Sequence, residues 1–412
     1  MPKPGVVRAR PHFRLRTSTH FWLLACVAIA VAGCATLERL PGAQIRQSQQ
    51  VKILGLSDAR FYVDDVDKIY SVALKAYQRH NLARPGAKTV NFLAISGGGD
   101  DGAFGAGLLV GWSERGDRPP FDVVTGVSTG SLAAPFAYLG QSYDPQLREV
   151  YTNITDDDVL RQRGVIMGTL ASDAMADSAP LRAMIERHLD EQMIRRIAEE
   201  YQKGRLLFIL TTNLDQGRPV IWNIGEIASS KEPGARKLIV DVLLASASIP
   251  GAFPPVMIDV TLDGVKYQEM HVDGGTIAQA FLYPPSYSVN EAAARRGIKA
   301  AVLRAHRKRI AYVIRNGRLF RNEEDVKLQT IAIAKQAITT MITTSGVNDT
   351  YRMYLLTRRD GVDFNLASIG TDFTTPYKGP FEQSYMRSLF DYGFEKGRNG
   401  HTWQKVPPGY TQ

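Results

Sequence analysis

Two short apolar segments of this chain each lead into a glycine-rich turn and then into a helical pattern. The segments are residues 90–96 (VNFLAIS) and 121–126 (FDVVTG), and the helical patterns cover 103–112 and 131–139. A short apolar run bounded by a turn is typical of a buried strand. Strand, tight turn and helix, repeated, are typical of βα units in a parallel sheet. The chain is therefore predicted to have an α/β fold.

The composition excludes several classes of protein. Hydrophobic residues make up 44% of the 412 residues and charged residues 22%, unlike a disordered or collagen-like chain. The two cysteines exclude a disulfide-stapled scaffold and a zinc site built on several cysteines. The net charge of +9 comes largely from the first 33 residues, which hold five basic residues and no acid. The remainder gives no electrostatic case for binding nucleic acid.

The N-terminus has the pattern of an export signal. A basic stretch precedes an apolar run at 21–32 (FWLLACVAIAVA), which is too short to span a bilayer but suits a signal peptide. The run ends in Val31-Ala32-Gly33-Cys34, which resembles the lipobox of bacterial lipoprotein precursors. The resemblance implies that residues 1–33 are removed, that the thiol and new amine of Cys34 are acylated and, with Ala35 next, that the protein is sorted to the outer membrane. An ordinary signal peptide with a chance cysteine is the alternative.

The remaining elements are expected from periodicity and turn residues. Residues 34–87 are expected to form a tether and an N-terminal helix at 64–80. Leu262-Asp263-Gly264 predicts a hairpin turn. Further strands are expected at 206–211, 219–224, 256–260, 265–271 and 310–315, and further helices at 180–200, 238–247, 325–343 and 381–396.

Ser128 lies in a G-x-S-x-G sequence made of Gly126, Val127, Ser128, Thr129 and Gly130. Because a strand precedes it and a helix follows it, the pattern predicts a nucleophile elbow, a tight turn that lifts the serine hydroxyl above the sheet. The N-terminus of the following helix favours negative charge near that oxygen. A plain turn serine is the alternative, since so short a motif also occurs by chance.

The first glycine-rich turn fits two kinds of site. It reads Gly97-Gly98-Gly99-Asp100-Asp101-Gly102, the G-x-G-x-x-G spacing of a dinucleotide-binding turn. Such a site needs an acid at the end of the second strand for the ribose, where this chain has the Ser128 turn. Backbone N–H groups at a helix start also stabilise an oxyanion. The turn is therefore predicted to be an oxyanion loop.

The general base for Ser128 has to come from further along the chain. His188 lies on an expected surface helix, His306 in a basic run and His401 in a polar tail, so none is an obvious partner. His271 stands two residues before Asp273. Asp273-Gly274-Gly275 places a carboxylate at a strand end, followed by two residues without side chains, where a buried acid can meet Ser128. Asp273 is therefore the preferred candidate.

Together these pieces resemble the patatin-like phospholipase family. The matching sequences are SGGGDDGAFGAG at 96–107, GVSTG at 126–130, ASASIPGAFPP at 245–255 and DGG at 273–275. Their order and spacing fit the family, and the similarity covers residues 88–320. Residues 321–412 are expected to form a C-terminal extension that packs on this domain.

The resemblance implies a three-layer α/β/α patatin-like fold with a mainly parallel central sheet. It also implies a Ser-Asp dyad without histidine, in which Ser128 is the nucleophile and Asp273 the proton acceptor. The backbone of residues 97–99 would form the oxyanion hole, with no metal or other cofactor.

The chain departs from the family at Asp101, where the family usually has Arg or Lys. Asp101→Arg is therefore expected to raise kcat/KM about tenfold. The alternative is that Asp100 and Asp101 cap the following helix.

The expected protein is an exported serine hydrolase of phospholipase A or lysophospholipase type, held at a bacterial membrane by the lipid on Cys34. It would cleave phospholipids or other acyl lipids through an acyl-enzyme, with no nucleic-acid partner. Two rivals stay open: a binding or scaffold lipoprotein with a weak or inactive site, and a Ser-His-Asp esterase of soluble esters.

Overall fold

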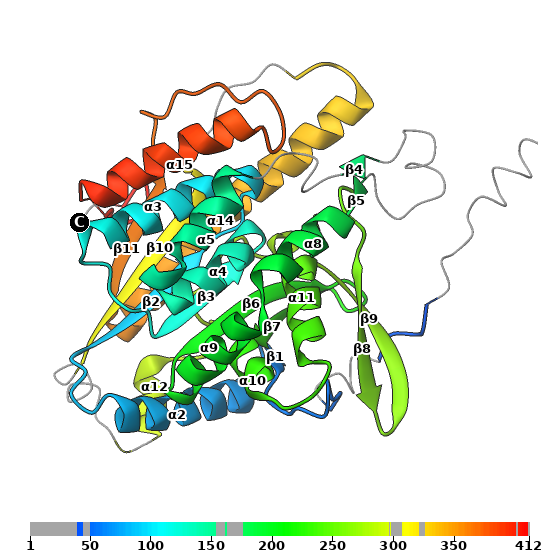
Figure 1. Ribbon diagram of the computed structural model, residues 1–412, viewed down its shortest axis with the longest axis vertical. Coiled ribbons are helices and arrows are strands. Elements are labelled where there is room, and N and C mark those ends of the chain that lie inside the picture. The colour runs from blue at the N-terminus through cyan, green and yellow to red at the C-terminus, as the bar shows by residue number, and fades with distance from the viewer. Residues whose placement is uncertain are drawn as a thin grey trace, which may run out of the picture.

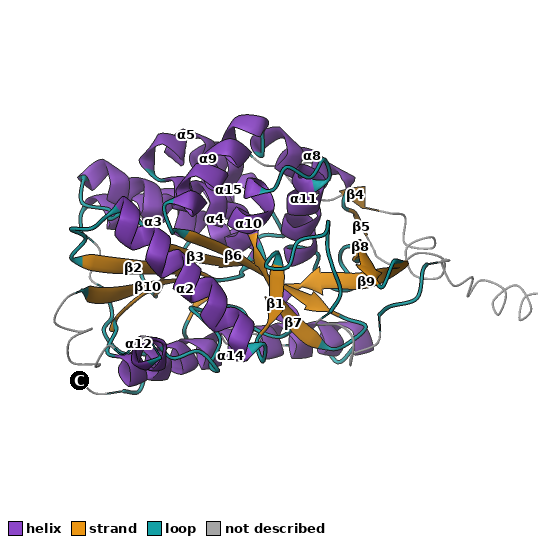
Figure 2. Cartoon of the chain, turned by 90° about the horizontal axis from the view of Figure 1, so that it is seen from below, coloured by secondary structure: helices purple, strands orange, loops and turns teal. Residues whose placement is uncertain are grey.

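The computed structural model describes residues 39–43, 50–153, 161–162, 176–295, 297, 307–320, 326–400 and 403–410. Within these residues, nine strands form one sheet that is enclosed between helices (Figures 1 and 2). This confirms the α/β fold predicted from the repeated βα units and the three layers that the family resemblance implies. The predicted signal peptide and Cys34 lie outside the described residues.

The centre of the sheet is parallel. Its five parallel strands lie in the order β6-β3-β2-β10-β11. Antiparallel β7 and β1 continue the sheet beyond β6, and the β8–β9 hairpin joins the end of β6 through β9. The strands are β1 (Arg60–Tyr62), β2 (Thr89–Ile95), β3 (Val123–Val127), β6 (Leu206–Asn213), β7 (Arg218–Asn223), β8 (Val256–Leu262), β9 (Val265–Asp273), β10 (Lys308–Arg318) and β11 (Asp363–Ile369), with β4 (Arg161–Gln162) and β5 (Ala176–Asp177) paired separately.

Helices cover both faces of the sheet. Figure 2 shows α3, α4, α5, α8, α9, α11 and α15 on one side and α12 and α14 on the other. None of the described helices is both long enough and apolar enough to cross a bilayer. The helices are α2 (Val66–Ala83), α3 (Gly102–Arg115), α4 (Thr129–Leu139), α5 (Asp144–Thr152), α8 (Ala179–His188), α9 (Glu191–Gln202), α10 (Ile224–Ser229), α11 (Ala235–Ser246), α12 (Val289–Ala294), α14 (Thr330–Asp360) and α15 (Gln383–Arg398).

Alternation along the strands builds a core on each face of the sheet. On β2, Leu93 and Ile95 join the larger core, whereas Phe92 and Ala94 join the smaller one. Successive side chains of a strand point to opposite faces, so a strand buried on both faces is apolar throughout. This explains why residues 92–95 form a continuous apolar run instead of an alternating one.

Several expected elements have different bounds in the structure. The single helix expected at 180–200 is two helices, because the Asp190 side chain accepts a hydrogen bond from Met193 N and caps α9. The helix expected at 325–343 continues to Asp360 as α14. The hairpin at 262–264 is present, with positive φ at Asp263 and Gly264. β11 had no sequence prediction.

The C-terminal helix packs closely on the helix that follows the first glycine-rich turn. A Cβ atom at Gly107 or Gly111 of α3 would overlap the backbone of α15, and one at Gly393 or Gly397 would overlap the backbone of α3. Because the missing side chains let the two backbones approach, α15 is fixed against α3. Residues beyond 320 thereby contribute to the helical layer through α15, and they contribute β11 to the sheet.

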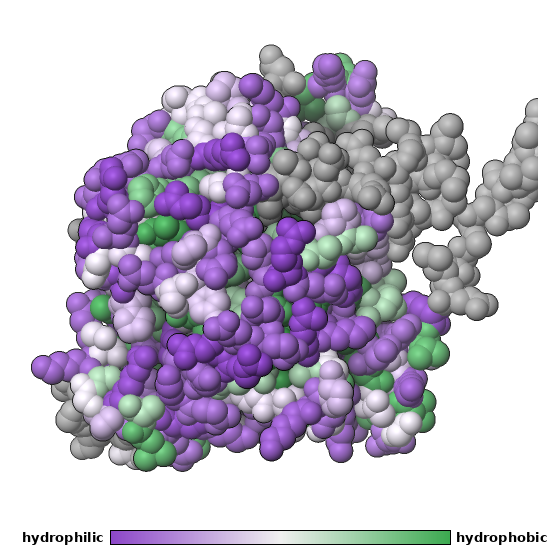
Figure 3. Space-filling view, viewed as in Figure 1, coloured by the Kyte–Doolittle hydropathy of each residue, from purple (hydrophilic) through white to green (hydrophobic). Residues whose placement is uncertain are grey.

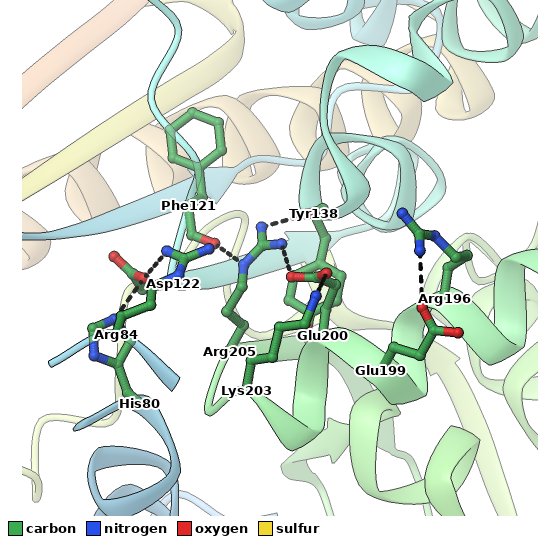
Figure 4. A network of polar contacts seen from close by, with 10 residues as sticks. All are labelled: His80, Arg84, Phe121, Asp122, Tyr138, Arg196, Glu199, Glu200, Lys203 and Arg205. Atoms are coloured by element: carbon green, nitrogen blue, oxygen red, sulfur yellow. Dashed lines mark hydrogen bonds and ion pairs between the residues drawn. The ribbon is translucent and has the colours of Figure 1, made fainter. Parts of the chain in front are cut away.

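Polar contacts link the N-terminal ends of the central strands to each other and to α2 (Figure 4). Asp122, just before β3, accepts hydrogen bonds from Asn91 N at 2.8 Å and Arg84 Nη1 at 3.3 Å, and it contacts His80 Nε2 at 3.1 Å. Arg205, just before β6, donates from Nε to Phe121 O at 2.8 Å. These contacts tie α2 to the sheet and give Asp122 a structural role.

Candidate active site

Ser128 occupies a strained turn between β3 and α4. Its φ is 54° and its ψ is −129°, in the positive-φ region that a non-glycine residue rarely adopts. A Cβ atom at Gly130 would overlap the backbone of Ile95, and one at Gly126 would lie 2.5 Å from Gly130 O. The glycines on either side of Ser128 are therefore needed for close packing, as a nucleophile elbow requires.

Strand β6 brings Ser128 and Asp273 together. Val127, the last residue of β3, pairs with Leu210 of β6, and Asp273, the last residue of β9, pairs with Thr211, the next position. The residue after Val127 therefore meets the end of β9. Ser128 Oγ donates a hydrogen bond to Asp273 Oδ2 at 2.6 Å, although 145 positions separate the two residues in the chain.

The carboxylate of Asp273 is held from several sides. Its Oδ1 accepts a hydrogen bond from Gly275 N at 2.6 Å, and its backbone N–H donates to Ser248 O at 2.9 Å. Thr212 Oγ1 donates to Asp273 O at 3.0 Å. A Cβ atom at Gly274 would lie 2.5 Å from Leu210 O, so the glycine after the aspartate lets β9 end against β6.

Burial raises the pKa of Asp273 from 3.8 to about 7. Loss of hydration disfavours the charged carboxylate, and the hydrogen bonds from Ser128 and Gly275 offset only part of that cost. A carboxylate with a pKa close to neutral can take up the serine proton far more readily than an aspartate in water.

The segment at 245–255 supports both residues of the pair. Ser246 Oγ accepts a hydrogen bond from Ser128 N at 3.1 Å and donates one to Leu210 O at 2.7 Å. Ser248 contributes the carbonyl that receives Asp273 N–H. The family resemblance included this segment, but only the structure shows that its serines hydrogen-bond to the backbone of Ser128 and Asp273.

The glycine-rich turn lies beside Ser128, and its N–H groups differ in whether they already donate a hydrogen bond. Gly97 N donates to Gln279 O at 2.9 Å, so this N–H is already occupied. No described residue accepts a hydrogen bond from Gly98 N or Gly99 N, and Gly99 lines the same cavity as Ser128. Of the predicted oxyanion-hole residues 97–99, Gly98 and Gly99 therefore remain the candidate N–H donors.

Two residues at the end of β10 hold the glycine-rich turn from behind, and sequence reasoning missed both. Arg315 Nη1 donates to Gly97 O at 3.0 Å and to Ser96 Oγ at 3.2 Å. Asn316 donates from N to Ser96 Oγ at 2.8 Å and from Nδ2 to Ser96 O at 2.9 Å, and its Oδ1 accepts from Gly105 N at 3.0 Å. These two residues reach the turn only because β10 pairs with β2, and no local sequence pattern predicts that pairing.

Asp100 and Asp101 bind the C-terminal region instead of capping the helix. Asp101 Oδ1 accepts a hydrogen bond from Tyr385 OH at 2.8 Å, and Asp100 Oδ2 accepts one from Phe381 N at 3.0 Å. Asp101, the N-cap residue of α3, makes no side-chain cap hydrogen bond. Burial raises the pKa of Asp101 to about 6, while Arg315 lies near enough to oppose that shift.

None of the described histidines is a hydrogen-bond partner of the Ser128 side chain. His271 is fully buried, with Nδ1 2.9 Å from Thr211 Oγ1 and Nε2 3.2 Å from Glu269 Oε2. His188 is half-buried, and its ring packs edge-on against Phe136, so it is less exposed than its expected surface position implies. His306 and His401 lie outside the described residues. The part of the chain that the structure describes has no cluster of acids, histidines or cysteines suited to a metal ion.

An apolar cavity opens beside the serine. It measures about 500 Å³, counted with the space at its mouth, and Gly99, Ser128 and Thr129 lie in its wall. The rest of the wall is almost entirely apolar, with side chains such as Leu132, Leu181, Met184, Phe253, Phe381 and Met386. A serine at the wall of an apolar cavity suits a substrate with a hydrocarbon chain next to the bond that reacts.

Comparison with known proteins relates part of this chain to a known family. Residues 93–283 match the family model of the patatin-like phospholipases. The domain has the patatin fold. The match contains the elbow, the glycine-rich turn and the end of β9 with Asp273.

Among solved structures, VipD from Legionella pneumophila resembles the chain with a TM-score of 0.39 and 12% sequence identity, over 76% of this chain and 67% of that one. No curated protein sequence matches the chain.

Proposed function

We propose that this protein is a lipid acyl hydrolase that uses Ser128 as nucleophile and Asp273 as proton acceptor. The observation that carries the proposal is the 2.6 Å hydrogen bond from Ser128 Oγ to a buried carboxylate, inside a domain that matches the patatin-like phospholipases. The raised pKa of Asp273, the N–H groups of Gly98 and Gly99, which no described residue accepts, and the apolar cavity support it.

In the first half of the reaction, Ser128 Oγ attacks the ester carbonyl carbon while its proton passes to Asp273 Oδ2. The carbonyl oxygen becomes an oxyanion, which the N–H groups of Gly98 and Gly99 stabilise together with the positive end of α4. The tetrahedral intermediate then collapses, and the bond to the alcohol breaks. The departing alcohol takes the proton from Asp273, which leaves an acyl group on Ser128.

The second half repeats these steps with water. Asp273 takes a proton from a water molecule as the water oxygen attacks the acyl carbon. Collapse of this second intermediate returns the proton to Ser128 Oγ and releases the fatty acid. One carboxylate thus serves first as base and then as acid, so no histidine is needed.

The described histidines lend no support to a Ser-His-Asp esterase. His271 contacts Thr211 and Glu269, and the described hydrogen-bond partner of Ser128 Oγ is Asp273. An inactive binding protein differs from the proposed enzyme in its reactivity toward a fluorophosphonate probe, which labels only an activated serine.

Ser128→Ala tests the proposed reaction directly. The variant should lose hydrolysis of a panel of phospholipids and short acyl esters by about a thousandfold or more, because the step that forms the acyl-enzyme needs this oxygen. Ser142→Ala, at an exposed position outside the cavity, is the control and should keep its activity. A folded Ser128→Ala protein that hydrolyses esters at a substantial rate would rule out Ser128 as nucleophile.

We also propose that the chain is exported and held at a bacterial membrane through lipid on Cys34. The motivation is the lipobox-like end of the apolar run at 21–32. Two or more acyl chains bind a membrane firmly, whereas one binds it reversibly. Cys34→Ala should therefore move the protein from the membrane fraction to the soluble one. A variant that stays in the carbonate-resistant pellet would place the attachment elsewhere.

A further inference from the structure

The first half of α14, residues 330–345, is open to solvent. Of the side chains described between 330 and 342, only Ala332 and Gln336 are partly covered, and none is buried. From Gly346 onward the helix has buried residues such as Met353. The first half projects from the body of the protein as the yellow part of α14 in Figure 1, and hydrophobic residues stand among polar ones there in Figure 3.

An apolar stripe runs along this exposed half. Five exposed residues occupy positions i, i+3, i+4, i+7 and i+8: Ala334, Ala337, Ile338, Met341 and Ile342. A helix normally turns a face with this spacing toward a core. Here Met341 is 71% exposed, and Leu328, just before the helix, is 96% exposed. The stripe therefore has the pattern of a buried helix face in an exposed place.

The charges beside the stripe are positive. Residues 326–348 contain two lysines, Lys327 and Lys335, and no acid. Lys327 is exposed. The nearest acids before this stretch, at 323–325, lie outside the described residues. An exposed apolar helix face with lysines and without acids suits the boundary of a bilayer that contains anionic lipids.

The exposed half points past the edge of the sheet at which Ser128 lies. α14 ends at Asp360 and leads into the amino end of β11, which is parallel to the central strands. Its first half therefore lies toward their carboxyl ends, where Ser128 follows β3. A Cβ atom at Gly346 would lie 2.5 Å from the side chain of Arg315, at the carboxyl end of β10. Thr330 stands sixteen positions before Gly346, which is about 24 Å along the helix.

The described N-terminal segment reaches the same edge of the sheet. Arg39 donates from Nη1 to Asp215 Oδ2 at 3.1 Å, and Gln268 N donates to Pro41 O at 3.2 Å. Asp215 lies in the turn at the carboxyl end of β6. Cys34 stands five positions before Arg39, a span of at most about 18 Å. A lipid on Cys34 would therefore enter a membrane close to this edge.

We propose that the apolar stripe of α14 docks on the surface of a phospholipid bilayer and turns the carboxyl ends of the central strands, with Ser128, toward the lipid. The inference rests on the proposed function, and it names the partner of that site as a bilayer with anionic head groups. The stripe and the lipid on Cys34 then hold the protein at two separate points, so they fix its orientation as well as its attachment.

The position and charge of the stripe favour a bilayer over a second copy of the chain. The proposed attachment at Cys34 holds this edge within reach of a membrane, and the proposed substrate of Ser128 is a membrane lipid. In a symmetric dimer the same patch faces itself. Two copies of the stripe would then bring their lysines together, and residues 326–348 supply no acid to pair with them.

A fluorescent label on the stripe tests the docking directly. Cys26 leaves with the predicted signal peptide and the Cys34 thiol carries the predicted lipid, so Met341→Cys would supply the free thiol of the mature chain. An environment-sensitive dye on Met341→Cys should shift to the blue on vesicles of phosphatidylethanolamine and phosphatidylglycerol, and brominated lipid should quench it. Leu82→Cys is the matched control and should show neither effect, because Leu82 is 85% exposed on α2, at the opposite edge of the sheet.

Hydrolysis by a charged variant of the stripe tests the consequence. Ile338→Glu combined with Met341→Glu should slow hydrolysis of vesicle phospholipid by roughly tenfold or more, because each apolar side chain kept in water costs the docked orientation about tenfold. The same variant should leave kcat/KM for soluble para-nitrophenyl butyrate unchanged. Leu74→Glu combined with Leu82→Glu places the same charges at exposed positions of α2 and should change neither rate.

The outcomes separate the docking from the proposed function. A dye on Met341→Cys that neither shifts nor is quenched, or unchanged vesicle hydrolysis in the double glutamate variant of α14, overturns the docking while ester hydrolysis stands. A shifted and quenched dye on a protein that hydrolyses neither substrate supports the docking and overturns the proposed function. A dimer in light scattering that the same variant disperses, with no dye signal on vesicles, assigns the stripe to a second copy and overturns the docking.

Discussion

Asp273→Asn should separate the role of this residue in catalysis from its cost to the fold. Asparagine has nearly the same shape, and its Oδ1 can still accept from Gly275 N while its Nδ2 faces Ser128 Oγ. It cannot take up a proton, so hydrolysis should be lost. It also carries no charge that must be buried, so the folded state should gain stability, and that gain should depend on pH.

The direction follows from the pKa of Asp273, which rises from 3.8 to about 7 on folding. Between these values the folded protein keeps a proton that the unfolded chain has released. Stability therefore falls as the pH rises through this window, and the penalty is complete above pH 7. It amounts to roughly 1.5 kcal/mol at pH 5 and roughly 4 kcal/mol at pH 8, at 1.36 kcal/mol per pKa unit. The advantage of the asparagine variant should thus grow by roughly 2.5 kcal/mol between the two pH values.

Urea unfolding of both proteins at pH 5 and pH 8 measures this difference. Asp259→Asn, on the exposed face of β8, is the control and should show no comparable pH dependence. In the parent protein, kcat/KM on an uncharged ester should rise tenfold per pH unit up to about pH 7 and then level off. A stability difference between parent and Asp273→Asn that is the same at both pH values would refute the buried, proton-holding carboxylate.

Two further predictions concern the charges around the glycine-rich turn. Arg315→Met should lower kcat by roughly tenfold or more with little change in KM, because a turn that shifts by a fraction of an ångström misplaces the N–H groups of Gly98 and Gly99. Arg315→Lys should recover part of the rate. Steady-state kinetics on one short ester measures both effects, and an unchanged kcat in Arg315→Met would contradict the prediction. Asp101→Asn should change kcat/KM by less than about threefold. Asp101→Arg should destabilise the fold by roughly 3 kcal/mol, because the arginine removes the acceptor of the Tyr385 hydrogen bond and adds a second cation near Arg315. Kinetics and melting curves for the two variants test this, and a faster, equally stable Asp101→Arg protein would show the reasoning to be wrong.

Local patterns were sufficient to predict the central part of the fold. The apolar runs at 90–96 and 121–126 are β2 and β3, and the turns after them lead into α3 and α4 as expected. Periodicity and turn chemistry act over a few residues, so the sequence alone reveals them. The approach of Asp273 to Ser128 was predicted from the strand end and its two glycines, and the structure brings the two residues together.

Features that depend on distant contacts could not be predicted in this way. Arg315 and Asn316 occupy an ordinary strand end, and their contacts with Ser96 arise only because β10 pairs with β2. β11 was missed because a strand at the sheet edge next to a long helix has no distinctive pattern. His188 was expected at the surface because it stands next to Arg187 on an amphipathic helix, but neighbouring positions on a helix face different directions.

The charge at position 101 shows why a single departure from a family pattern does not decide activity. The sequence suggested that an acid near the oxyanion loop opposes catalysis, which assumed an isolated carboxylate. In the structure Tyr385 donates to that carboxylate, and Arg315 lies near enough to act on it. The same Arg315 donates to Gly97 O, so a buried cation contacts the turn from β10 instead of from the start of α3. The expected gain from Asp101→Arg therefore loses its physical basis. Arg315 already supplies a cation at the turn, and the substitution would replace the carboxylate that attracts Arg315 with a second cation.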